Sequence, residues 1–239
     1  MNYSFTDQLM RENPSFLLEN MMGPNAMRVT EELCASTNIP KGARILDLGC
    51  GTGLSSILLA EKYGATVYAA DLWVSPSDNY ARFQARGLEN RVIPLSADVT
   101  RGLPFAHEYF DFLFCVDAYH YFGAGEDMLP FLLSFLKQGG ILAVGMPGVQ
   151  RPFPDGIPAE MTAFWQEDMN FHPLEWWRAL WEKAPNAKLL TCREMDCHQQ
   201  AWEEWLKCPS PYAVQDIPMM AAENGQYFSH IQMMAQRVG

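Results

Sequence analysis

The chain has 239 residues, a length that suits a single α/β domain. Hydrophobic residues make up 49% of it and charged residues 19%, which supplies a core and argues against a disordered chain. The formal charge of −11 argues against a nucleic-acid partner, because proteins that bind the phosphate backbone present patches of Lys and Arg. No apolar run approaches the ~20 residues of a membrane helix, and residues 1–7 lack a secretory signal pattern. We therefore expect a cytoplasmic protein without membrane insertion.

The cysteines indicate neither a disulfide framework nor a metal site. The chain is too long to need disulfide staples, and it contains no C-x-x-C pair. The cluster at Cys192, Cys197-His198 and Cys208 matches no common zinc spacing. In a strand over residues 188–195, Cys192 and Cys197 would point to opposite faces. We expect reduced, buried thiols and no metal at all six positions: Cys34, Cys50, Cys115, Cys192, Cys197 and Cys208.

Short apolar runs recur along the chain at the spacing of strands in an α/β domain. Residues 112–116 are continuously apolar, as in a strand that a parallel sheet buries on both faces. Residues 92–95 make a weaker strand, because Pro94 fits best at a strand end or edge. The expected strands are 44–48, 66–70, 92–95, 112–116 and 141–146, followed by two closing strands at 188–195 and 226–238.

Helical patterns alternate with these strands. One helix has Ser75 as its N-cap and Pro76 at its first position, and it stops at Gly87. The others are expected over 6–12, 14–22, 25–36, 54–63 (with Gly64 as C-cap), 126–137 and 173–183, with a helical or irregular insertion over 200–224. The alternation predicts an α/β fold: a Rossmann-like, doubly wound, mostly parallel seven-stranded sheet with a helical N-terminal prefix and C-terminal helical insertions.

A glycine turn lies between the first strand and its helix. Residues 45–53 read ILDLGCGTG, with the spacing G-x-G-x-G and an acid, Asp47, at its base. This is neither the dinucleotide fingerprint G-x-G-x-x-G nor a P-loop, and the acid would repel a pyrophosphate. Asp71 ends the second strand, 18 residues beyond Gly53, where a carboxylate accepts hydrogen bonds from ribose hydroxyls. Together the two features predict a nucleoside-type cofactor that carries a cationic group.

With these motifs the sequence resembles the class I S-adenosylmethionine-dependent methyltransferases. It is most similar to their small-molecule groups, which act in menaquinone, ubiquinone or phosphoethanolamine methylation or are like cyclopropane synthases. The resemblance implies one domain: residues 1–40 as a helical lid, 41–147 as the cofactor-binding core, and 148–239 as a substrate-side insertion with closing strands. The matching motifs run in order over residues 45–146: 45–53, Ala70-Asp71-Leu72, Ala97-Asp98, 103–105 before Phe110-Asp111, and 136–140.

The resemblance also implies which residues bind S-adenosylmethionine. Those at the methionine end are Asp47, Gly49, Cys50, Gly51, Thr52, Gly53, and Asp117 or its neighbouring backbone. Those at the ribose and adenine are Asp71, Leu72, Trp73, Ala97, Asp98 and Val99. Asp98 lies five residues before Leu103 where four is more usual, so the adenine contact could come from Asp98 or Val99.

The stretch after the fourth strand is the candidate catalytic segment. His120 has a side chain that can act as a base near neutral pH, and Tyr119 or Tyr121 could present a ring face to a sulfonium. Alternatively this stretch only lines the pocket, and the reaction works by alignment alone. Residues 20–25 and the tryptophan-rich insertion, which holds six of the seven tryptophans, would form the other wall. Such a wall favours a small apolar or aromatic methyl acceptor.

Two other functions stay open at this point. A catalytically silent protein that binds S-adenosylmethionine or S-adenosylhomocysteine for regulation would keep the glycine turn and lack an acceptor pocket. Methylation of nucleic acid or protein is disfavoured by the charge and by the sequence Asp117-Ala118-Tyr119-His120, which lacks the Asn-Pro-Pro-Tyr-like tetrapeptide of amino-methylating families. Release of S-adenosylhomocysteine in the presence of a metabolite pool separates an enzyme from a binding protein.

Overall fold

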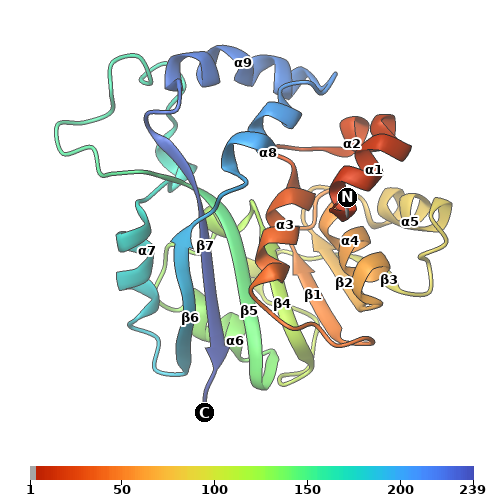
Figure 1. The fold of residues 1–239 in the computed structure, drawn as a ribbon. Helices are drawn as coiled ribbons and strands as arrows, with labels where there is room; N and C mark the ends of the chain where they lie inside the picture. Colours follow the sequence, from red (N-terminus) through yellow and green to blue (C-terminus); the bar gives the residue numbers. More distant parts are fainter. Residues whose placement is uncertain (1–3) are drawn as a thin grey trace.

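The computed structural model describes residues 4–239, so the expectation for the chain start rests partly on Met1–Tyr3, which lie outside the described residues. The strands form one sheet with the order β3-β2-β1-β4-β5-β7-β6 (Figure 1). Strands β1 to β5 are parallel, and β7 runs antiparallel to both of its neighbours. This confirms the predicted mostly parallel, doubly wound sheet. The strands are β1 (Arg44–Leu48), β2 (Thr66–Asp71), β3 (Val92–Ser96), β4 (Phe110–Val116), β5 (Leu136–Val149), β6 (Ala187–Glu194) and β7 (Phe228–Arg237).

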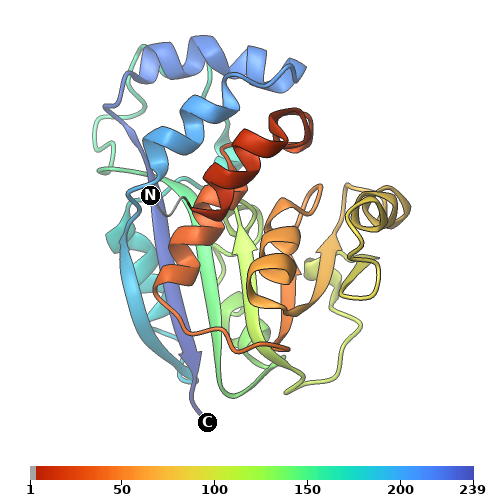
Figure 2. The same ribbon diagram turned by 45° about the vertical axis from the view of Figure 1, so that its right-hand side comes forward.

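Helices cover both faces of the sheet. One core cluster joins the sheet to α3 (Ala26–Ala35), α4 (Leu54–Tyr63) and α5 (Pro76–Ala85). The other joins it to α6 (Met128–Leu133) and α7 (Leu174–Trp181). The remaining α-helices lie above the end of the sheet at which the parallel strands finish, in both views (Figures 1 and 2). They are α1 (Phe5–Glu12), α2 (Pro14–Asn20), α8 (His198–Trp205) and α9 (Pro211–Glu223).

Local signals place most of these boundaries where the sequence predicts them. The Ser75 hydroxyl accepts a hydrogen bond from the Ser77 amide at 3.2 Å, which caps α5. Gly64 ends α4 with φ 66°, a conformation that costs glycine little. Pro94 lies in β3, the edge strand of the sheet, where its missing N–H is tolerated. In the described part of the chain, no helix is long and apolar enough to cross a membrane.

The predicted helix over residues 126–137 is wrong at its C-terminal end. α6 stops at Leu133, and β5 begins at Leu136, which is fully buried and pairs with Phe110. The register between β4 and β5 then shifts, and Lys137 forms an ion pair with Asp111 at 2.5 Å. The glycine pair at 139–140 forms an irregularity inside the strand, which in sequence alone looks like a helix C-cap.

A buried polar cluster ties the N-terminal prefix to α8. The Arg28 guanidinium contacts the Glu204 carboxylate at 2.7 Å, and both side chains are 9% exposed. The Asn25 amide donates to the same carboxylate at 2.6 Å. The Thr52 hydroxyl of the glycine turn donates to the carbonyl oxygen of Asn20, at the end of α2. The prefix is thereby fixed both to the C-terminal helices and to the first turn of the sheet.

Candidate active site

The glycine turn occupies the switch point between β1 and β4, where the strand order reverses and α/β folds bind ligands. Gly49, Gly51 and Gly53 have φ values of 72°, 54° and 84°, which glycine adopts readily. A Cβ on Gly49 would lie 2.3 Å from the Ala118 Cβ, so only glycine allows β1 and the segment after β4 to approach this closely. The turn is therefore packed directly against the residues that follow β4.

Asp71 at the end of β2 organises the backbone around the turn. One carboxylate oxygen accepts from the Gly51 amide at 2.8 Å, and the other accepts from the amides of Trp73 and Val74, both at 2.8 Å. The side chain is 7% exposed. Because an ionised carboxylate has about four acceptor sites, one remains for a ligand.

Asp47 lies beneath the turn and does not reach the cavity. It is fully buried, and one of its oxygens accepts from the hydroxyls of Ser55 and Ser56 at 2.6 and 2.5 Å. Its other oxygen has no partner within residues 4–239. Burial raises the pKa of Asp47 to about 6, although the two hydroxyl groups favour its ionised form. The residue holds α4 against β1.

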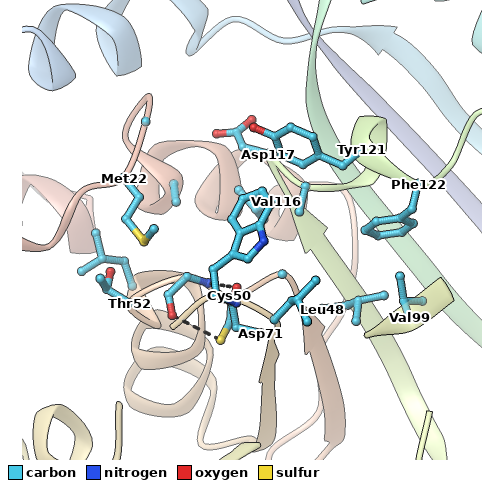
Figure 3. A pocket seen from close by; sticks show the side chains of 18 of the residues that line it. Met22, Leu48, Cys50, Thr52, Asp71, Val99, Val116, Asp117, Tyr121 and Phe122 are labelled. Atoms are coloured by element: carbon cyan, nitrogen blue, oxygen red, sulfur yellow. Dashed lines mark hydrogen bonds between the residues drawn. The ribbon is translucent and has the colours of Figure 1, made fainter. Parts of the chain in front are cut away.

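A cavity of about 390 Å³ opens above this floor. Figure 3 shows Asp71 and Cys50 at its base, Met22 on one side, and Tyr121 and Phe122 on the other. Within the described chain, none of the lining residues is basic, and the charged side chains that line it are all carboxylates. The lining residues come from the prefix (Asn20–Pro24, Ala26), from the ends of β1 and β2 (Leu48–Thr52, Leu54, Asp71–Trp73), and from the segments after β3 and β4 (Ala97–Thr100, Val116–Ala118, Tyr121, Phe122).

Two aromatic side chains meet at the cavity mouth. Trp73 is 70% exposed and Tyr121 56% exposed, and their rings pack edge to face with centroids 5.4 Å apart. Burial raises the pKa of Tyr121, and the nearby Asp117 carboxylate raises it further. The phenol is therefore protonated at neutral pH and presents a hydroxyl donor and an apolar ring.

Asp117 follows β4 in a left-handed conformation, with φ 52°. Its amide donates to the Gly145 carbonyl oxygen at 2.8 Å, which holds this backbone in place. Oδ1 accepts a hydrogen bond from His230 Nε2 at 2.8 Å. Oδ2 is buried and has no partner in the part of the chain that the structure describes. Such an atom suits a cationic ligand group, because an unpaired buried acceptor is costly.

Comparison with known proteins identifies a family match for the central part of the chain. Residues 45–140 match the family described as "Methyltransferase domain". These residues form a class I, S-adenosylmethionine-dependent methyltransferase domain. They contain the glycine turn, Asp71, Asp98 and Asp117. The resemblance to class I methyltransferases predicted from the sequence is confirmed at that level.

Individual relatives share the domain but differ in function. The chain is 30% identical to the methyltransferase GfsG of Streptomyces halstedii over 57% of this chain and 49% of that protein. It is 31% identical to the trans-aconitate 2-methyltransferase of Paracidovorax citrulli, over 50% of this chain and 45% of that protein. The chain thus spans about half the length of the curated relatives it matches. A crystal structure of the [4+2]-cyclase SpnF has a TM-score of 0.70 at 19% identity, covering 98% of this chain and 96% of that one, so the fold alone does not decide the reaction.

The methyltransferase domain brings together nearly all of the residues predicted to bind the cofactor. Asp47 and Gly53 are the exceptions, since neither lines the cavity. Asp98 lines it, but its Oδ1 already accepts from the Thr100 hydroxyl at 2.6 Å. That hydrogen bond holds the pKa of Asp98 below its usual value. Val99 also lines the cavity, so both predicted sources of the adenine contact are in place.

The two residues predicted to be catalytic lie in different surroundings. Tyr121 lines the cavity, whereas His120 does not. His120 is 3% exposed, and its ring packs against Tyr121 and Phe171. Burial lowers its pKa to about 4, even though Asp117 acts in the opposite direction. A group with that pKa is a weak base at neutral pH.

The tryptophan-rich insertion does not wall this cavity, and that prediction is wrong. Trp177, Trp181 and Trp205 are almost fully buried in the two cores, because their large rings fill the space between helices and sheet. The tryptophan that does line the cavity is Trp73, outside the insertion. The other predicted wall, residues 20–25, is largely in place. Among residues 4–239, no group of three or more potential metal ligands comes together, and the six cysteines are unpaired thiols.

The partner of Asp117, His230, is a site residue that the sequence alone does not reveal. His230 belongs to β7, which lies inside the sheet, and its side chain is fully buried. Its contact with Asp117 spans 113 residues of sequence. No local pattern signals such a pair; only an antiparallel β7 between β5 and β6 would have predicted it.

Proposed function

We propose that this protein transfers a methyl group from S-adenosylmethionine to a small, uncharged, apolar or aromatic metabolite. The observation that carries the proposal is the composition of the cavity. Its base has the acids and glycines that suit a nucleoside with a cationic tail, and its remaining lining is mostly apolar or aromatic, with Asn20, Thr52 and Thr100 as the polar members. Its volume of about 390 Å³ lies within the ordinary range for small-molecule sites.

The cofactor would be held by residues of the methyltransferase domain. The open acceptor site of Asp71 is available to a ribose hydroxyl, and Leu72 and Trp73 would flank the adenine. Asp98 or the Val99 amide would contact the adenine edge. The unpaired Oδ2 of Asp117 would accept from the methionine ammonium. Asp47 would act indirectly, by fixing the turn from below.

When bound, S-adenosylmethionine supplies a methyl group on a sulfonium, a good leaving group for in-line displacement. The chain then has to align the acceptor and exclude water. Met22, Tyr121 and Phe122 surround the upper part of the cavity and suit both tasks (Figure 3). We assign no proton transfer to His120, because its buried ring lies outside the cavity lining and its pKa is about 4.

The charge of the cavity argues against a polyanionic acceptor. Several relatives are named for methylation of trans-aconitate. This molecule carries three carboxylates, and a binding site for it needs cationic partners. The described residues that line the cavity include no such cationic partner. The methyl acceptor of this protein is therefore proposed to differ from that of the trans-aconitate enzymes.

The proposal is tested by incubating the protein with methyl-labelled S-adenosylmethionine and two acceptor pools, one of neutral apolar and aromatic metabolites and one of polycarboxylates. Labelled product and S-adenosylhomocysteine are expected from the first pool only. Product from trans-aconitate would refute the proposed acceptor class. Tight binding of S-adenosylhomocysteine with no turnover on any pool would favour the non-catalytic alternative.

A further inference from the structure

Behind Asp117 lies a hydrogen-bonded pair of histidines from two other elements. His230 Nδ1 is 3.1 Å from His198 Nδ1, and His230 Nε2 is 2.8 Å from Asp117 Oδ1. His230 is fully buried in β7, and His198 is the half-buried first residue of α8. The three side chains form a line from the cavity wall to the base of the C-terminal helices.

The strand register explains why these residues meet. β7 pairs with β5 so that His230 lies opposite Pro147, next to the end of β4 where Asp117 follows. The Met195 amide, just past β6, donates to the His230 carbonyl oxygen at 2.8 Å. The short connection from there to α8 brings His198 beside His230. The contact between His230 and His198 is therefore set by the register of the sheet.

The hydrogen bonds determine which ring nitrogens carry protons. An ionised carboxylate only accepts, so His230 Nε2 donates to Asp117. A neutral His230 then has an unprotonated Nδ1, which accepts from Nδ1–H of His198. Burial lowers the pKa of His198 to about 4, and the neighbouring His230 adds to this effect, so His198 is neutral at physiological pH. The charged or titratable groups around the pair are Asp117, His120 and Glu223.

We propose that His230 and His198 are positioning residues that hold the Asp117 carboxylate toward the ammonium group of the cofactor's methionine. This inference rests on the proposed function and adds two residues to its site. Three features support it: Oδ1 is committed to His230, Oδ2 is left unpaired, and the backbone of Asp117 is held by Gly145. Ala118, the next residue, touches the glycine turn, so the carboxylate lies beside the proposed methionine end. His198 does not contact Asp117; it acts through His230, whose tautomer it fixes.

The test compares two ligands that differ only at the methionine end. S-adenosylhomocysteine carries the amino-acid tail, whereas 5′-methylthioadenosine has the same adenine and ribose but no ammonium. Affinities of both are measured by calorimetry for the wild type, His230→Phe, His230→Gln and His198→Phe. His107→Phe, at an exposed histidine away from the cavity, is the matched control.

His230→Phe keeps the ring volume and removes the donor, so it should weaken S-adenosylhomocysteine about tenfold and 5′-methylthioadenosine less than twofold. His230→Gln can donate through its amide and should recover the loss to within about threefold of wild type. His198→Phe leaves Asp117 and His230 in place and should weaken S-adenosylhomocysteine about threefold. The control should bind both ligands as the wild type does.

Unchanged affinity of His230→Phe for S-adenosylhomocysteine would overturn the inference. So would an equal loss for both ligands, because a merely structural role predicts that result. If His230→Phe does not fold, His198→Phe decides, and wild-type affinity in that variant would overturn the inference. A wild-type protein that binds neither ligand would refute the proposed function itself, which separates that failure from this one.

Discussion

Replacing Asp71 by Asn tests the assignment of the ribose site with the least change in shape. The carboxylate accepts three backbone amides in the structure, from Gly51, Trp73 and Val74. An amide oxygen can still accept from the two amides on the α5 side. The new NH₂ group, however, would face the Gly51 N–H, donor against donor, and the charge is lost. The variant therefore weakens both the turn and the contact to a ribose hydroxyl.

The expected magnitude follows from the number of acceptor sites. Three of about four sites on Asp71 are already used, so the carboxylate can form one full hydrogen bond to the ribose. A hydrogen bond to a charged group contributes about 1.5–3 kcal/mol. At about 1.4 kcal/mol for each tenfold change, Asp71→Asn should weaken S-adenosylhomocysteine roughly ten- to a hundredfold. Asp71→Ala, which also releases all three amides, should lose tenfold or more.

Calorimetry with S-adenosylhomocysteine and 5′-methylthioadenosine measures the effect, with thermal unfolding to confirm that the fold persists. Both ligands contain the ribose, so Asp71→Asn should weaken both by a similar factor, unlike the histidine variants. Asp78→Asn, at an exposed acid in the first turn of α5, is the control and should change neither affinity. Wild-type affinity in Asp71→Asn would remove Asp71 from the site.

The other predictions concern ligand choice, the prefix and the buried histidines. S-adenosylhomocysteine should raise the melting temperature, whereas equal concentrations of NAD or ATP should not; a larger shift with NAD would refute the family assignment of the site. Glu204→Ala leaves the buried Arg28 guanidinium without its main partner, which should lower the free energy of unfolding by about 3–5 kcal/mol and the melting temperature by at least about 6 °C. Glu203→Ala, at an exposed position of the same helix, should leave the melting temperature unchanged. His120→Asn should keep turnover within about threefold of wild type; a hundredfold loss would restore His120 as the base. The lowered pKa values of His120 and His198, about 4, mean that the unfolded chain binds more protons below pH ~6.5, so stability should fall as the pH drops from there toward 4. Asp47, with its pKa raised to about 6, opposes this trend in the same range, and melting curves of His120→Asn against pH should be flatter than those of the wild type.

The sequence predicts well which residues gather at the base of the cavity, because each of them follows a strand that is recognisable locally. The glycine turn, Asp71 and Asp98 each sit at the carboxyl end of a strand, and parallel strands bring those ends to one edge of the sheet. Apolar runs and helix caps locate these strand ends, and they therefore predict that the three features lie together. Asp47 does not follow this pattern, because it lies within β1 and its side chain faces α4 and not the cavity.

The sequence predicts the rest of the site poorly because burial and long-range pairing decide it. His120, three residues past Asp117, looked correctly placed for catalysis, but the short helix η2 (Tyr119–Tyr121) turns its ring into the core and leaves Tyr121 at the cavity. The tryptophans looked like a substrate wall, but helices packing on a sheet need large apolar side chains. In both cases the residue type is compatible with a role in the site, but packing places the side chain in the core.

The choice of acceptor follows from how the cofactor and acceptor sides of the cavity meet. In the proposed function, the cofactor contacts the carboxylates that line the cavity, and one of these, Asp117, is hydrogen-bonded to His230 from β7. What remains for the acceptor is the space bounded by Met22, Tyr121 and Phe122, where the described residues supply no cation to balance an anionic substrate. The prefix that carries Met22 is tied to α8, and α8 also begins with His198. A shift of α8 would therefore move Met22 through the prefix and move Asp117 through the histidine pair. We accordingly expect that variants of α8 change the affinity for the acceptor and the affinity for the cofactor together.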